Sequence, residues 1–480
     1  MKKNKGAVSI LLTMIVLAMI TVIGAAGDVC SLAVAKSYAQ RMNYMACNSV
    51  LAEYNSELFK DYGLMGFEGG KYEIKDLVEK YTSMMSRINA DPGEELVIFD
   101  VRIRDISVDC SETDLCEKPV FMEQIRELMK LKVVEKGTEK LMDALQGRID
   151  IGKKADEAKS GYEQKQNEEA TGEGNDINIS ERIYDPEDKG QDRVLKSRYI
   201  IESLPSNPNK NTDYKEYGNY NLGEELELLK LGEDSSDFLN KFYSYAGAGA
   251  DKFFLIDYAD VYFKNAVKDT SGFKETFFYN EMEYLLKGHM SDSKNLSSVR
   301  RDLFLLRTAL NLAHIYSDPE KSRVVFEAAA ASGAGPYAAA LQFVFAAAWA
   351  GVEASEDIER LFMGGKVPFI KENKDWKTDV ESIFSDTEMI SADYEGERGL
   401  DYTEYIKLLL ITCDKEKLME RIMDLIQINM KGRYDMSFDL RNHITGFRIS
   451  ADYEREAFLP KVMPGIVEDD LMHIEEVFSY

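Results

Sequence analysis

The N-terminal stretch MKKNKGAVSILLTMIVLAMITVIGAAGD, residues 1–28, decides the architecture of this chain. Residues 7–27 carry no charged side chain, and a helix of that length measures about 30 Å, the thickness of the hydrocarbon core of a bilayer. Three lysines and no acidic residue precede this run, and Asp28 follows it. Because positively charged flanks stay in the cytoplasm, the pattern predicts a single-pass protein whose bulk lies outside the cell.

We interpret residues 7–27 as an uncleaved transmembrane helix in the lipid bilayer, behind a basic cytoplasmic leader, residues 1–6. The residues that mark this membrane anchor are Ala7, Leu12, Leu17, Ile20 and Gly27. Cleavage by signal peptidase near Gly27 is the alternative, because small residues end the run. The run is longer than the roughly 7–15 apolar residues of a usual signal peptide, which favours the anchor.

A helical pattern continues beyond the apolar run. From Leu32 to Leu58, apolar residues recur at spacings of three and four, and no proline interrupts them. We therefore predict one continuous helix from Ala7 to about Lys60. Four of its residues are expected to contact helices of partner subunits: Ala35, Ala39, Met42 and Ala46.

A membrane helix that runs into a water-exposed amphipathic helix is also how type IV pilin-like subunits begin. The leader KKNKG followed by Ala7 resembles a prepilin-peptidase site in which Gly6 is the last leader residue. Pilins usually carry a glutamate five residues into the mature chain, whereas this chain has Leu11, so the resemblance does not include that carboxylate. The sequence leaves open whether the chain is cut after Gly6, near Gly27 or not at all.

Residues 35–67, AKSYAQRMNYMACNSVLAEYNSELFKDYGLMGF, resemble the start of TadE/TadG-like proteins of Gram-positive anaerobes. The likeness continues in EMEYLLKG (281–288), NLSSVRRDLFLLRTALNLAHIY (295–316), AAAWAGVEASEDIERLFMGGKVPFIK (346–371) and GLDYTEYIKLLL (399–410). Together these segments resemble an uncharacterised clostridial family of single-pass surface proteins often associated with Tad-type pilus assembly. The resemblance implies other pilus or membrane-anchored subunits as partners, and it brings no assigned activity.

The remaining chain predicts a mainly α (α+β) fold with a small β element. In the membrane-proximal part, residues 28–149, the segment LVIFDVRIRDISV (96–108) alternates as a strand does. The alternation slips in phase after Ile103, which indicates a β-bulge.

Residues 150–193 hold few large apolar side chains and many polar ones, which predicts a disordered insertion. Residues 194–480 are predicted to form a mainly helical extracellular domain. Within it, residues 337–352 (YAAALQFVFAAAWAGV) are apolar on all faces but short and alanine-rich for a span, so they predict a core helix. Residues 436–452 alternate and predict a C-terminal strand or hairpin, which could pair with residues 96–108.

Charge and cysteine content restrict the partners. The 59 basic and 85 acidic residues give a net charge of -26, which repels phosphate backbones, so nucleic acid is not an expected partner. The five cysteines contain no CxxC pair, which excludes a recognisable zinc site or disulfide framework. A disulfide between Cys110 and Cys116 stays open, as do the oligomeric state and any specific ligand.

No recognisable catalytic or cofactor pattern is present. The four histidines lack metal-ligand spacing, and GGKVPFIK (364–371) lacks the spacing of a phosphate-binding loop, which predicts a structural role for that segment. We therefore expect no catalytic residues, cofactor or metal. The sequence favours a non-catalytic, membrane-anchored structural or accessory protein of a Tad-like pilus or secretion system. The alternative is an extracellular ligand- or partner-binding module that uses a surface around Trp349 and Trp376.

Overall fold

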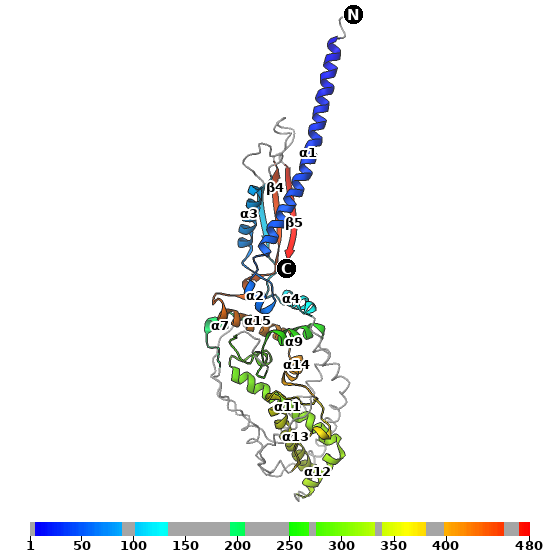
Figure 1. The fold of residues 1–480 in the computed structure, drawn as a ribbon, viewed down its shortest axis with the longest axis vertical. Coiled ribbons are helices and arrows are strands. Elements are labelled where there is room, and N and C mark those ends of the chain that lie inside the picture. The colour runs from blue at the N-terminus through cyan, green and yellow to red at the C-terminus, as the bar shows by residue number, and fades with distance from the viewer. Residues whose placement is uncertain are drawn as a thin grey trace. The chain divides into compact units, whose positions relative to one another are not determined.

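The fold comes from a computed structural model in which the described residues are 5–88, 101–132, 193–206, 249–267, 275–331, 338–380, 398–455 and 470–480. The chain divides into two compact units. Unit 1 comprises Met1–Gln124 and Asp439–Tyr480, and unit 2 comprises Ile125–Phe438. The protein is mainly helical with small antiparallel sheets, which confirms the predicted fold class (Figure 1).

Unit 1 combines a long helix with two small sheets. Its elements are α1 (Lys5–Leu51), α2 (Ser56–Tyr62), β1 (Phe67–Glu68), α3 (Lys71–Ile88), β2 (Val101–Asp109), β3 (His443–Ile444), β4 (Gly446–Arg455) and β5 (Asp470–Ser479). A further helix, α4 (Lys118–Leu131), contains the boundary between the units. The larger sheet has the antiparallel order β2-β4-β5, and β1 pairs with β3. Unit 1 is therefore built from both ends of the chain.

The pairing of β2 with β4 confirms the predicted contact between the two alternating segments. Its register runs from Val101 opposite Arg455 to Asp109 opposite Arg448. The register shifts between Ile103 and Asp105, where the slip in phase predicts a bulge. Residues 96–100 of the predicted strand lie outside the described residues.

The C-terminal strand prediction needs correction at its start. The long strand begins at Gly446, and Leu440–Asn442 form a 3-10 turn instead. The side chain of Asp439 accepts a hydrogen bond from the backbone N–H of Arg441, which stabilises the turn in place of an extended strand. Strand β5 was not predicted at all.

The second half of α1 lies along the sheet and forms the core of unit 1 (Figure 1). One face of this half-helix packs against inward-pointing strand residues such as Ile449 and Phe478. Alanines at 35, 39 and 46 are fully buried, and their small side chains let the helix approach the strands closely. Helix α3 covers part of the same face through Ile74 and Val78.

Helix α1 ends at Leu51, so the predicted continuous helix to about Lys60 is wrong at its C-terminal end. After a short turn, the side chain of Asn55 accepts a hydrogen bond from the backbone N–H of Leu58 and caps α2. Gly63 then ends α2 in the left-handed conformation, with a φ of 68°. Local capping restarts the helix although the apolar spacing continues across the break.

Helices make up most of the described part of unit 2. Its elements are α7 (Arg198–Glu202), α9 (Ala250–Tyr262), α10 (Glu281–Lys287), α11 (Asp292–Ser317), α12 (Pro319–Ala331), α13 (Ala338–Phe362), the 3-10 turn Asn373–Asp375, α14 (Tyr402–Thr412) and α15 (Lys415–Arg433). Residues Phe343, Ala346 and Trp349 of α13 are buried in one cluster with side chains of α11 and α12. The segment predicted as a core helix is therefore confirmed as one. The predicted insertion lies outside the described residues except for Arg193.

Candidate functional site

The first half of α1 is apolar and exposed. Among the described residues, this is the one helix long and apolar enough to cross a membrane, and none of its most apolar stretch is buried within the chain. The predicted anchor residues Leu12, Leu17 and Ile20 are 63%, 59% and 55% exposed. Gly6 and Ala7 lie in the backbone of the same helix, and Gly27 is exposed. Such a surface suits a membrane anchor or a signal sequence.

A buried ion pair marks the point where this exposed half ends. Arg455, at the end of β4, is 1% exposed, and its Nη1 lies 3.4 Å from Oδ1 of Asp28. The same nitrogen donates a hydrogen bond of 3.3 Å to the backbone carbonyl of Asp28. Asp28 is the first charged residue after the apolar run. The sheet is therefore attached to α1 directly where the apolar run stops.

A second polar cluster fixes the position of α1 on the sheet. The buried amide of Asn43 donates to Oε2 of Glu476 at 3.1 Å and accepts from the hydroxyl of Tyr453 at 3.3 Å. Burial raises the pKa of the neighbouring Cys47 thiol to about 12, and the charge of Glu476 adds to this shift. Because these groups are buried, sliding the helix along the sheet would leave them without hydrogen-bond partners.

The four residues predicted to contact partner helices are used within the chain. Ala35, Ala39 and Ala46 are 0% exposed and Met42 is 3% exposed, all in the core of unit 1. The helical spacing was interpreted correctly as an apolar face, but the sheet of the same chain occupies that face. Two of the strands that cover it come from the C-terminal region, which the helix's own sequence cannot reveal.

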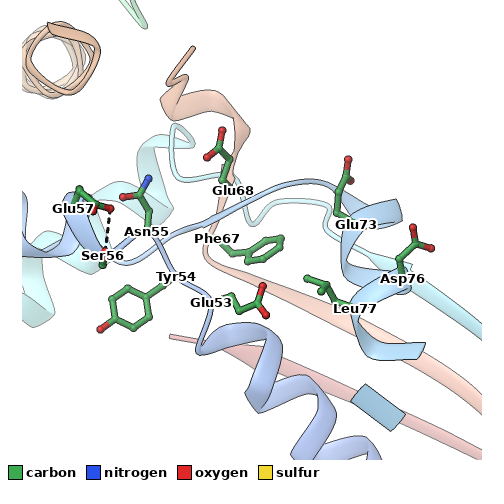
Figure 2. A pocket seen from close by; sticks show the side chains of 10 residues that line it. All are labelled: Glu53, Tyr54, Asn55, Ser56, Glu57, Phe67, Glu68, Glu73, Asp76 and Leu77. Carbon is green, nitrogen blue, oxygen red and sulfur yellow. Dashed lines mark hydrogen bonds between the residues drawn. The ribbon is translucent and has the colours of Figure 1, made fainter. Parts of the chain in front are cut away.

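An acidic groove of about 590 Å³ lies elsewhere in unit 1 (Figure 2). Its lining residues are Glu53, Tyr54, Asn55, Ser56, Glu57, Phe67, Glu68, Glu73, Asp76 and Leu77. In Figure 2, Phe67 lies between the turn after α1 and Leu77 of α3, with carboxylates around this apolar floor. A hydrogen bond with Glu53 raises the pKa of Tyr81. The carboxylates around the groove give it a negative charge that suits a cationic partner.

Buried carboxylates form a third polar feature, in unit 2. Burial raises the pKa of Glu281 and of Glu283 to about 7. Glu281 accepts from the backbone N–H of Lys264 at 3.1 Å, and Glu283 accepts from that of Ala266 at 3.0 Å. The hydroxyl of Tyr402 also donates to Glu283 at 2.7 Å. These carboxylates hold the chain after α9 against α10.

A buried ionic network holds the segment GGKVPFIK in place. Lys371 pairs with Glu353 and, at 2.6 Å, with Asp357, while Arg307 lies 2.9 Å from Asp357. Arg307 also donates to the carbonyls of Pro368 and Phe369. Burial alone would raise the pKa of Asp357, but the charges of Arg307 and Lys371 lower it. Groups of this segment therefore take part in the buried core of unit 2, in keeping with the structural role that the sequence predicts for it.

The structure also shows where the two tryptophans and the cysteines named in the sequence predictions lie. Trp349 is buried in the core of unit 2, and its indole N–H donates to Thr378 at 3.0 Å, whereas Trp376 is half-buried against it. Among the described residues, which include all five cysteines, no disulfide forms, and Cys110 and Cys116 are not bonded to each other.

Sequence reasoning missed the Asp28–Arg455 pair, strand β5 and the groove. Strand β5 had a usable signal, because Met472, Ile474 and Phe478 recur at even spacing and are buried. The Asp28–Arg455 ion pair had no such sequence signal, because its two residues lie far apart in the sequence.

Comparison with known proteins gives a partial match to a family model and no activity. Residues 237–455 match a family of unknown function, DUF5702. The match covers much of unit 2 and continues through β4, and it leaves out α1. No curated protein and no solved structure matches the chain.

Proposed function

We propose that this protein is a non-catalytic, single-pass membrane protein whose uncleaved α1 places units 1 and 2 outside the cell. One observation carries the proposal: α1 is exposed and apolar up to Gly27, and the same unbroken helix then forms the core of unit 1. A removable signal sequence has no need to continue into the folded core. Three lysines before the run favour a cytoplasmic N-terminus.

A role as a structural or accessory component of a Tad-like pilus or secretion system extends this proposal. It is supported by the resemblance of residues 35–67 to TadE/TadG-like proteins and by a long helix whose second half packs on an antiparallel sheet. Because the sheet covers Ala39 and Ala46, partner subunits would meet the exposed first half of α1. Gly24 and Ala25 offer small residues there for close helix packing.

N-terminal sequencing of the protein recovered from its native membrane tests the anchor. A start at Met1 supports a plain anchor, a start at Ala7 supports pilin-like processing, and a start near Asp28 contradicts the anchor. Protease added to intact cells should digest both units, and an intracellular control protein should survive. Resistance of the units in intact cells would contradict the proposed topology.

Binding of a cationic partner is the second candidate function, and the acidic groove favours it. The double variant Glu68→Gln/Glu73→Gln should weaken binding of a tetralysine peptide and reduce its dependence on salt concentration. Glu320→Gln/Glu327→Gln, at two exposed positions of α12, removes the same amount of charge elsewhere and is the matched control. Equal binding by all three proteins in titration calorimetry would remove the groove from consideration.

A further inference from the structure

The end of the sheet nearest Asp28 consists of a row of three aligned residues, one from each strand. In the antiparallel register, Val101, Arg455 and the backbone of Asp470 stand side by side as the first row of the three strands. Arg455 of this row is bonded to Asp28. No spacer therefore separates the end of the apolar run from the first row of the sheet.

This geometry sets the depth of the row relative to a bilayer. The polar headgroup layer on each side of the hydrocarbon core is roughly 5–7 Å thick. A helix rises about 1.5 Å per residue, so about four residues after Gly27 cross that layer. Asp28 is the first of them, and the side chain that holds it belongs to the first row of the sheet. With residues 7–27 in the hydrocarbon core, this row lies at headgroup depth.

The side chains around the row suit such a position. Val29 is 68% exposed and Leu471 is 50% exposed, although both are large and apolar. Arg102 and Arg104 are exposed on β2. Arginine combines an apolar stem with a guanidinium that binds phosphate in a bidentate manner. Glu454 stands opposite Arg102 in the register, so the net charge here is small.

We propose that this rim of unit 1, formed by Val29, Arg102, Arg104 and Leu471, contacts the phospholipid headgroup layer directly. Unit 1 then contacts the surface of the bilayer directly, and no flexible linker separates it from the membrane-spanning helix. The contact uses the phosphate that zwitterionic and anionic lipids share, because Glu454 offsets part of the positive charge. The inference rests on the proposed anchor function, since a cleaved α1 would not hold the rim at the membrane.

The test uses the full chain reconstituted in phosphatidylcholine vesicles that carry a nitroxide on the lipid headgroup. In a Cys30→Ser background, a fluorophore is attached to Leu471→Cys at the rim or to Ser479→Cys at the other end of β5. The two sites are separated by about 27 Å along the strand, at about 3.4 Å per residue. Quenching at position 471 should exceed quenching at position 479 at least threefold. The Cys30→Ser protein without either added cysteine is labelled in parallel, and its quenching gives the background signal.

The arginines are tested in the same assay. Arg102→Ala/Arg104→Ala should reduce quenching at position 471 by about half, because two phosphate contacts are lost. Arg448→Ala, at the opposite end of the sheet, should leave it unchanged. Unchanged circular dichroism melting curves would show that each variant is folded, and a variant that melts early is replaced by the corresponding glutamine substitution, which also removes the charge.

Flotation on a density gradient separates the possible failures. Protein that floats with the vesicles but shows equal, weak quenching at positions 471 and 479 overturns the rim contact and leaves the anchor standing. Protein that does not float overturns both the anchor and the rim. Strong quenching at both positions also overturns the rim contact, since unit 1 would then lie flat on the bilayer.

Discussion

Units 1 and 2 depart from the usual distribution of side chains in opposite directions. Unit 1 exposes a long apolar surface, the first half of α1, while unit 2 buries charged groups such as Glu283, Asp357 and Lys371. The buried charges are paired or hydrogen-bonded within unit 2, so they require no outside partner. In the part of the chain that the structure describes, nothing covers the apolar half of α1 in a comparable way. Unit 1, through this exposed apolar surface, is therefore the part of the protein expected to need an environment other than water.

The largest effect is expected from substitutions that make the exposed half of α1 polar. Leu12→Arg/Leu17→Arg should prevent stable membrane association, because each arginine near a helix centre costs about 2.5–3.5 kcal/mol of insertion free energy. Membrane pellets washed with carbonate should lose the variant. The matched control, Ser37→Arg/Gln40→Arg, changes exposed positions in the second half and should stay in the pellet. Retention of the first variant would show that this surface does not need lipid.

The next largest effect should come from breaking the ionic network of unit 2. Asp357→Ala leaves Arg307 and Lys371 buried with one counter-charge fewer, which should lower the free energy of unfolding by about 3–5 kcal/mol. Both tryptophans of the chain lie in unit 2, so intrinsic fluorescence follows its unfolding by urea. Glu327→Ala removes an exposed pair with Arg323 and should cost less than about 1 kcal/mol. Equal losses of unfolding free energy for Asp357→Ala and Glu327→Ala would contradict the conclusion that the charges buried in unit 2 stabilise one another.

The stability of unit 2 should also depend on pH, through two of its buried carboxylates. The folded pKa of Glu281 and Glu283, about 7, lies above the ordinary value of 4.5, so the native state binds more protons between these values. Their stabilising contribution is complete below pH 4.5 and is lost as the pH rises to 7, by an amount on the order of 3 kcal/mol per group.

Glu283→Gln mimics the protonated form and should flatten this slope. Its free energy of unfolding, followed by tryptophan fluorescence at pH 5 and pH 8, should change less than that of the wild type. Glu327→Gln is the control and should retain the wild-type slope. A wild-type stability that rises between pH 5 and pH 8, with no change on Glu283→Gln, would rule the effect out.

The smallest perturbation is chemical modification of two native thiols of α1, whose rates can be compared without any substitution. Cys30 is exposed, whereas Cys47 is buried with its pKa raised to about 12. Since the thiolate is the reactive form, maleimide at pH 7.5 should modify Cys30 at least a hundredfold faster. Peptide mass spectrometry measures both rates in one sample, and urea should equalise them. Similar rates in the native protein would mean that the second half of α1 is not packed as described.

Much of the local structure could be predicted from the sequence, and the errors have physical reasons. The apolar run, the core helix around Trp349 and the bulge after Ile103 each follow from spacing within one segment. The helix end at Leu51 was missed because an N-cap at Asn55 outweighed a continuing apolar pattern. The groove could not be predicted, since it joins the turn after α1 to residues of β1 and α3.

Local patterns of residues were enough to predict the charge-free helical run at residues 7–27, the mainly helical character of the chain that follows, and the apolar face of residues 35–46. What covers that face, and where the sheet attaches to the helix, became known only from the folded chain. Helical and strand periodicities depend on neighbours a few residues apart, so they can be read locally. The pair of Asp28 with Arg455 and the seating of α1 on β4 and β5 join opposite ends of the chain, and no local pattern encodes such distances.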